Sequence, residues 1–121
     1  TPLAQKAAVC PEDLWELPLI ISHQKGDDRH LSQWMEREIA ELNVVATYNL
    51  VFNASLLVDE GLGYAVTLDK LLNTQGSSLC FRPLSPGLVA EACLVWKKYQ
   101  VFSRAARLFL DSLRDLLAIP L

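Results

Sequence analysis

The sequence predicts an α/β layered domain with a largely parallel central sheet. Short, nearly continuous apolar runs alternate along the chain with segments whose apolar residues recur every three or four positions. The first pattern is typical of strands buried on both faces, and the second is typical of amphipathic helices. Alternation of the two favours a parallel sheet, because parallel strands need a crossover connection between them.

The first third of the chain predicts two strands with a helix between them. WELPLIIS (15–22) predicts a buried strand, and Pro18 marks where its ladder begins, because proline cannot donate to a ladder. HLSQWMEREIAEL (30–42) predicts an amphipathic helix with Asp28 as its N-cap. NVVATYN (43–49) is rich in β-branched and aromatic residues, which favour a strand. The apolar stripe of the helix is Leu31, Trp34, Met35, Ile39 and Leu42.

The stretch LVDEGLGYAVTL contains two glycines two positions apart, which raises the question of a phosphate-binding loop. The preceding NLVFNASLLVDEG has helical apolar spacing, with either Asn49 or Asn53 capping its start. Gly61 stands where that helix ends, a position that favours glycine because the backbone there is commonly left-handed. GYAVTL then predicts a third buried strand. A phosphate loop has the reverse order, strand before glycines and helix after, so we expect no nucleotide site.

The rest of the chain predicts a short helix, two strands and a long final helix. LDKLLN (68–73) is the short helix, and LCFRPL (79–84) and AEACLVWKKYQ (90–100) are the fourth and fifth strands. Ser103 is the expected N-cap of the final helix, which Pro120 ends. Its expected buried stripe is Ala106, Phe109, Leu113, Leu116 and Leu117.

Composition narrows the class of function. The 121 residues carry a net charge of −3, whereas phosphate binding needs a basic surface, so we expect no direct contact with nucleic acid. No apolar run reaches the ~18 residues of a membrane helix, and no signal-peptide pattern is present, so we expect no membrane contact. Three widely spaced cysteines predict neither a disulfide framework nor a zinc site, and we expect no cofactor.

The sequence contains no recognisable catalytic constellation. Ser22 and His23 are neighbours, but adjacent residues of a strand point to opposite faces. No GxSxG motif is present. The acidic pairs at 27–28 and 59–60 lie at element ends, where solvated caps and turns are usual. We therefore expect no catalytic residue, no metal site and no enzymatic activity.

Polar residues follow the first three predicted strands. Ligands of open α/β sheets bind beyond the carboxyl ends of the strands. A helix that begins near Asn49 or Asn53 would also direct free N–H groups towards an anion. The alternative is that these polar residues only cap helices. The strand ends are Ser22-His23-Gln24, Thr47-Tyr48-Asn49 and Thr67-Leu68.

Three stretches resemble the C-terminal effector-sensing region of LysR-type transcriptional regulators: ATYNLVFNASLLVDEGLGYAVTLDKL, LCFRPLSPGL and LVWKKYQVFSRAARLFLDSLR. TPLA followed by PEDLWELPLI is similar to the crossover into the second regulatory subdomain of that family. The resemblance implies a lobe like that of type II periplasmic binding proteins, in a cytoplasmic regulator that assembles as dimers of dimers. DNA is then contacted only through an N-terminal helix-turn-helix that this chain lacks.

The resemblance also implies a division of the chain. Residues 1–80 would form the second lobe, and 81–121 its remainder plus the strand and helix that return to a first lobe, with the exchange near Leu79 to Pro83 and Trp96 on the returning part. A small metabolite, often an organic acid, binds between the lobes. The implied effector contacts are Ser22, His23, Gln24, Asn49, Phe52, Asn53 and Thr67.

Half of such a cleft is absent from this chain, so we expect it to bind effector weakly or not at all. We also expect its final helix to cover its apolar face by self-association, giving a homo-oligomer. The alternatives are the solute-binding lobe of a transport system, which requires export, and a free-standing small-molecule binding protein. An enzyme would show turnover dependent on His23 or an acid.

Overall fold

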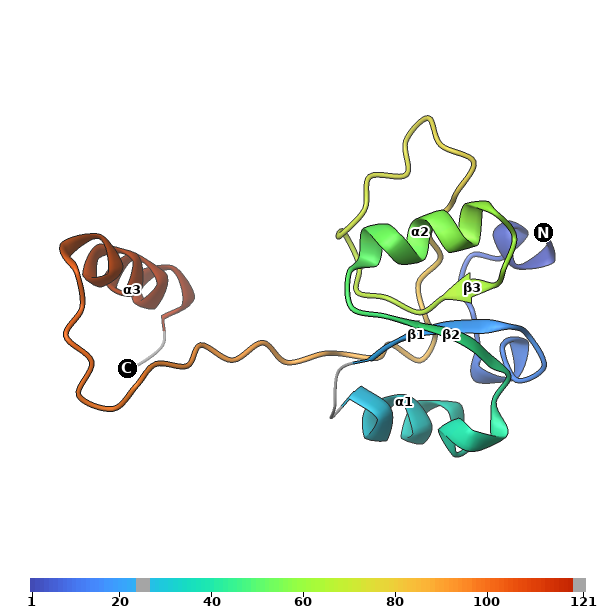
Figure 1. The fold of residues 1–121 in the computed structure, drawn as a ribbon, viewed down its shortest axis with the longest axis horizontal. Coiled ribbons are helices and arrows are strands. Elements are labelled where there is room, and N and C mark those ends of the chain that lie inside the picture. Colours follow the sequence, from blue (N-terminus) through green and yellow to red (C-terminus); the bar gives the residue numbers. More distant parts are fainter. Residues whose placement is uncertain (24–26, 119–121) are drawn as a thin grey trace. The chain divides into compact units, whose positions relative to one another are not determined.

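The computed structural model describes residues 1–23 and 27–118, which fall into two compact units, Thr1–Ala90 and Glu91–Leu121 (Figure 1). Gln24 and Pro120 lie outside the described residues. The elements in chain order are η1 (Pro2–Gln5), η2 (Pro11–Asp13), β1 (Leu19–Ser22), α1 (Asp27–Met35), η3 (Ile39–Glu41), β2 (Val44–Tyr48), α2 (Val51–Asp59), β3 (Tyr64–Ala65) and α3 (Arg104–Leu117), where η denotes a 3₁₀ helix.

A parallel three-stranded sheet, in the order β2-β1-β3, forms the centre of the first unit. β1 pairs with β2 up to Ser22↔Tyr48 and with β3 at Ile20↔Ala65. α1 connects β1 to β2, and α2 connects β2 to β3, as parallel pairing requires. The predicted α/β class with a mainly parallel sheet is confirmed.

α1 and α2 cover opposite faces of the sheet, which therefore lies between two helical layers (Figure 1). Leu19 and Ile21 of β1 pack into the core cluster that includes Trp34 and Met35 of α1. Ile20, between them in sequence, points to the other face and is also fully buried. The prediction that the first strand is buried on both faces is therefore confirmed.

The first helix is shorter than its apolar spacing predicts. α1 ends at Met35, Glu36 has a positive φ of 55°, and the chain resumes as the short η3. Leu42 still lies in the core, and Ile39 packs against it. Apolar periodicity therefore identified the inward-facing residues but not the helix break. Asp28 lies inside α1, so the prediction that it is the N-cap is wrong.

α2 begins later than one of its two predicted starts and ends where predicted. Its N-cap is Leu50, without a side-chain cap, so neither Asn49 nor Asn53 caps it. Gly61 adopts φ 81° directly after the helix, and its N–H donates to the carbonyl of Val58 at 2.9 Å. The next N–H reaches back to a carbonyl one residue earlier in the helix, which completes a Schellman cap. The prediction that Gly61 stands at the end of this helix is confirmed.

Gly63, the second glycine, permits a close approach between two backbone segments. Tyr64 donates its N–H to the carbonyl oxygen of Pro18 at 2.8 Å, which starts the pairing of β3 with β1. A Cβ atom on Gly63 would lie 2.5 Å from that same oxygen. β3 itself extends only over Tyr64–Ala65, shorter than predicted and half-buried.

Residues 66–103 contain no helix or strand, so the predicted helix over 68–73 and the strands over 79–84 and 90–100 are not observed. A single parallel bridge joins Val9 to Leu84. Strands form by pairing, and Val95 and Tyr99 of the fifth predicted strand are almost fully exposed. A β-like sequence therefore remains without ladder partners in the described part of the chain.

α3 begins as predicted, but its apolar stripe is not buried. The Ala106 N–H donates to Ser103 Oγ at 3.2 Å, which confirms the N-cap. Phe109 and Leu116 are 59% and 81% exposed, so the expected burial is wrong for the chain by itself. The amphipathic pattern indicates a helix face that needs a partner. Among the described helices, none is long and apolar enough to cross a membrane.

Candidate functional site: the carboxyl edge of the sheet

Parallel pairing brings the carboxyl ends of the three strands to one edge of the sheet. Ser22 pairs with Tyr48, and the His23 N–H donates to the carbonyl of Tyr48 at 2.8 Å. On the other side of β1, the Val66 N–H donates to the carbonyl of Ile20 at 3.0 Å. We call the end formed by Ser22, His23, Tyr48, Val66 and Thr67 the carboxyl edge.

Tyr48 makes a contact at this edge that the sequence did not reveal. Its hydroxyl donates to the carbonyl oxygen of Val66 at 2.7 Å. β1 lies between β2 and β3, so this bond runs from one outer strand across β1 to the residue that follows the other outer strand. The position of Tyr48 at a strand end was visible in the sequence, but its partner, 18 residues further along, was not.

Thr67 carries a buried hydroxyl without a hydrogen-bond partner among the described residues. Such a group costs about 1–3 kcal/mol, because it has given up water without replacing it. Most buried polar groups in folded proteins are paired, so an exception needs an explanation. Thr67 is one of the residues for which the sequence predicts an effector contact.

The start of α2 contributes backbone donors at the same edge. α2 begins three residues after the end of β2, with no acidic residue in its first turn. Among its first N–H groups, that of Asn53 donates to the carbonyl of Leu50 at 3.0 Å, and Leu50 offers no side chain that could cap those of Val51 and Phe52. Leu50 and Phe52 are mostly exposed and flank these donors with apolar surface. A helix start of this kind attracts anions.

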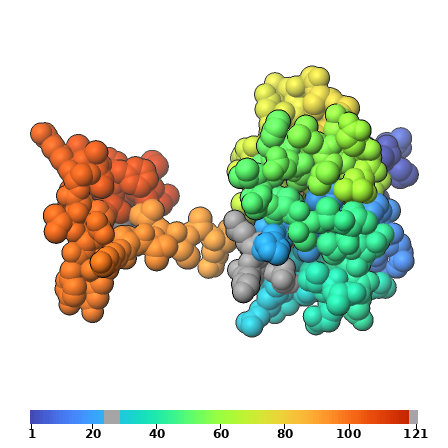
Figure 2. All heavy atoms as spheres, in the orientation of Figure 1, coloured from blue at the N-terminus to red at the C-terminus, as the bar shows by residue number. Residues whose placement is uncertain are grey.

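Most of the expected effector contacts lie in two places, the strand ends and the start of α2. Ser22, His23 and Thr67 lie at the strand ends. Asn49, Phe52 and Asn53 lie at the start of α2, and all three are exposed. The position of Gln24 falls outside the described residues. Figure 2 shows the atoms of α2, in green, on the face of the first unit turned to the viewer.

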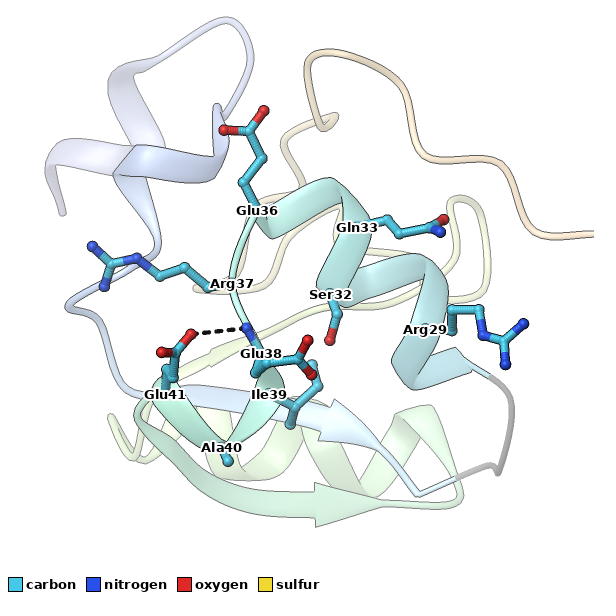
Figure 3. A pocket seen from close by; sticks show the side chains of 9 residues that line it. All are labelled: Arg29, Ser32, Gln33, Glu36, Arg37, Glu38, Ile39, Ala40 and Glu41. Atoms are coloured by element: carbon cyan, nitrogen blue, oxygen red, sulfur yellow. Dashed lines mark hydrogen bonds between the residues drawn. The ribbon is translucent and has the colours of Figure 1, made fainter.

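A separate open groove of about 960 Å³ runs along α1 and η3 rather than along the carboxyl edge. Its charges are mixed, and Figure 3 shows Arg29 and Arg37 pointing away from each other. The guanidinium of Arg37 lies 4.1 Å from the ring centre of Trp15 and 3.5 Å from a carboxylate oxygen of Glu16. The lining residues are Arg29, Ser32, Gln33, Glu36, Arg37, Glu38, Ile39, Ala40 and Glu41.

The groove offers no obvious ligand chemistry. The Glu41 carboxylate accepts from the Glu38 N–H at 3.0 Å, so it is occupied in capping η3 (Figure 3). No lining residue is an expected effector contact. Among the described residues, no group of three His, Cys, Asp or Glu side chains is placed to hold a metal ion. Cys10, Cys80 and Cys93 are free and exposed.

The two segments by which the chain enters and leaves the sheet run side by side. The Val9 N–H donates to the carbonyl of Pro83 at 2.9 Å, and the Ser85 N–H donates to the carbonyl of Val9 at 2.8 Å. The Arg82 guanidinium donates to the carbonyl of Ala4. This parallel contact lies beside the segment, Leu79 to Pro83, in which the sequence predicts the exchange between lobes.

An ion pair holds the incoming segment. Lys6 Nζ lies 2.6 Å from the carboxylate of Asp13. The hydrogen bond from Lys6 lowers the pKa of Asp13 below its ordinary value, and the Cys10 N–H adds to this effect. The same bond raises the pKa of Lys6. Both groups are therefore ionised at neutral pH.

A parallel sheet with helices on both faces, polar residues at its carboxyl edge and paired crossing segments defines a class of α/β lobe that can bind ligands at that edge. The family model described as LysR substrate binding domain matches residues 1–118. The chain belongs to this family, whose fold is that of type II periplasmic binding proteins and whose domains are regulatory rather than catalytic. No curated protein and no solved structure matches the chain.

Proposed function

We propose that this chain is the effector-sensing part of a LysR-type transcription regulator. It binds a small metabolite between its carboxyl edge and a first lobe, and the bound metabolite controls DNA binding by an N-terminal helix-turn-helix. The observation that carries this proposal is the match of the LysR substrate binding domain to residues 1–118. The regulator works in the cytoplasm, where its DNA and its metabolite meet.

The carboxyl edge supports a small anionic effector. The uncapped start of α2 offers backbone N–H donors, and His23, which is exposed, bonds through its N–H to the carbonyl of Tyr48, three residues before that helix. Phe52, 63% exposed, provides apolar surface for the body of a ligand. An organic acid satisfies both features. The proposed contacts are Ser22, His23, Gln24, Asn49, Phe52, Asn53 and Thr67.

The first lobe supplies the other half of the cleft. Residues 1–80 form the second lobe, and 81–121 complete it and return to the first. The exposed apolar residues of α3 support this division, because a helix with such a face is stable only when the face is covered. In the chain alone, we expect weak effector binding and association between copies.

The test is to isolate the native polypeptide from its source cells with an antibody against residues 91–118, and to measure its intact mass and its retention on genomic DNA. We expect a species much longer than 121 residues that binds DNA. A species of this length without DNA affinity would contradict the proposal. It would favour a free-standing binding protein, and a processed precursor would favour a transport lobe.

A further inference from the structure

The hydrogen bond between Tyr48 and Val66 lies one residue before the unpartnered hydroxyl of Thr67. β3 is two residues long, and its pairing with β1 continues only as far as the Val66 N–H. Beyond Val66 the chain enters a region without helix or strand. The bond from the Tyr48 hydroxyl is therefore the last hydrogen bond before Thr67 among the described residues.

Thr67 keeps a hydroxyl that does not stabilise the free chain. Valine has the same shape, and it would avoid the cost of burying an unpaired O–H group. A position that retains such a cost often serves binding, because functional sites give up stability for ligand contacts. The cost disappears when a ligand supplies the missing hydrogen bond.

We propose that Tyr48 is a positioning residue that fixes Val66 and thereby holds the Thr67 hydroxyl ready for one hydrogen bond to a ligand. The complementary group is an oxygen of a carboxylate or a hydroxyl, because Oγ1 both donates and accepts. This inference rests on the proposed function and assigns to Tyr48 a role that the effector contacts named above do not include. It predicts that Thr67→Val raises the stability of the chain and lowers its affinity for the ligand.

The effect of Thr67→Val on stability is measured by chemical unfolding of the 121-residue chain without ligand. We expect the unfolding equilibrium constant to fall at least about fivefold, since an unpaired buried hydroxyl is removed and the shape is kept. Thr67→Ser is the control, because it keeps the hydroxyl and loses the methyl group, and it should not stabilise the chain. If Thr67→Val destabilises the chain, the hydroxyl has a partner in the free protein and the inference is overturned.

The role of Tyr48 is tested by amide hydrogen exchange in Tyr48→Phe. Loss of its hydroxyl should speed exchange at the Val66 amide, which donates to the carbonyl of Ile20, while leaving the His23 amide protected, because His23 bonds to the backbone carbonyl of Tyr48. Tyr64→Phe is the matched control, since Tyr64 lies in the same sheet and its hydroxyl is not the tether. Equal exchange at Val66 in both variants would overturn the positioning role.

Ligand binding is tested by titrating acetate, malate and benzoate into the labelled chain and following amide resonances by NMR, which detects millimolar affinity. We expect one of these carboxylates to shift the resonances of Thr67 and Phe52. Its dissociation constant should rise at least about fivefold in Tyr48→Phe and Thr67→Val but not in Tyr64→Phe. Equal affinity in all variants overturns the inference, whereas the proposed function is decided separately by the native polypeptide.

Discussion

Replacing Gly63 with alanine should destabilise the first unit more than any other glycine-to-alanine change tested in it. The new Cβ would lie 2.5 Å from the carbonyl oxygen of Pro18 and 3.3 Å from Cγ2 of Val45. The first distance is far below van der Waals contact, and the atom it meets is backbone rather than the end of a flexible side chain. The two segments must therefore separate.

That separation has two costs. Overpacking a tight contact costs about 1–3 kcal/mol. The same carbonyl accepts the Tyr64 N–H at 2.8 Å, and weakening that bond adds about 0.5–1.5 kcal/mol. Together we expect a loss of about 2–4 kcal/mol from the free energy of unfolding, a large part of the about 5–15 kcal/mol of a typical domain.

The assay is urea unfolding followed by tryptophan fluorescence in a Trp96→Phe background, so that Trp15 and Trp34 report on the first unit alone. Gly61→Ala and Gly87→Ala are matched controls, because a Cβ on either glycine meets nothing within 4 Å. Gly61 has φ 81°, so its alanine variant should lose about 1–2 kcal/mol. Gly87→Ala should change stability by less than about 0.5 kcal/mol. If Gly63→Ala proves as stable as Gly87→Ala, the close approach between Gly63 and Pro18 is refuted.

Two further predictions concern charge and association. The lowered pKa of Asp13 means that its ion pair with Lys6 stabilises the chain above the ordinary carboxyl pKa, and that this contribution is lost as pH falls through the lowered value. Asp13→Asn should therefore flatten the acid limb of the urea-derived stability curve below about pH 5, and an unchanged limb would contradict the pairing. Sedimentation of the 121-residue chain should show oligomers that Leu116→Glu dissociates, because the apolar face of α3 is exposed. A monomeric wild type would exclude association through that face.

The sequence predicted the parts of the fold that depend on local pattern. β1 and β2 were found because each is a short apolar or β-branched run, and Gly61 was correctly assigned to a helix end because its role depends on one backbone angle. The break after Met35 was missed, since Leu42 faces the core whether the chain is one helix or two. The strand expected over 90–100 is absent because strand formation depends on a partner, which no local pattern supplies.

The candidate site was also predicted only in part. The sequence placed polar residues at the strand ends, and parallel pairing brought Ser22, His23 and Thr67 to one edge. It did not reveal the bond from Tyr48 to Val66, because that contact depends on strand order, which places β1 between them. It also could not show that the Thr67 hydroxyl is buried without a partner, since burial depends on the whole fold.

The central claim, that a metabolite bound at the carboxyl edge controls DNA binding, is tested most directly on the native DNA-binding polypeptide. Its affinity for its DNA would be measured with and without the small-molecule fraction of its cells, for the wild type, Phe52→Ala and Leu56→Ala. Phe52 and Leu56 are similarly exposed on α2, but only Phe52 is a proposed contact. We predict that metabolites change the DNA affinity of the wild type and of Leu56→Ala but not of Phe52→Ala. A DNA affinity that metabolites leave unchanged in the wild type, or change equally in all three, would contradict the claim.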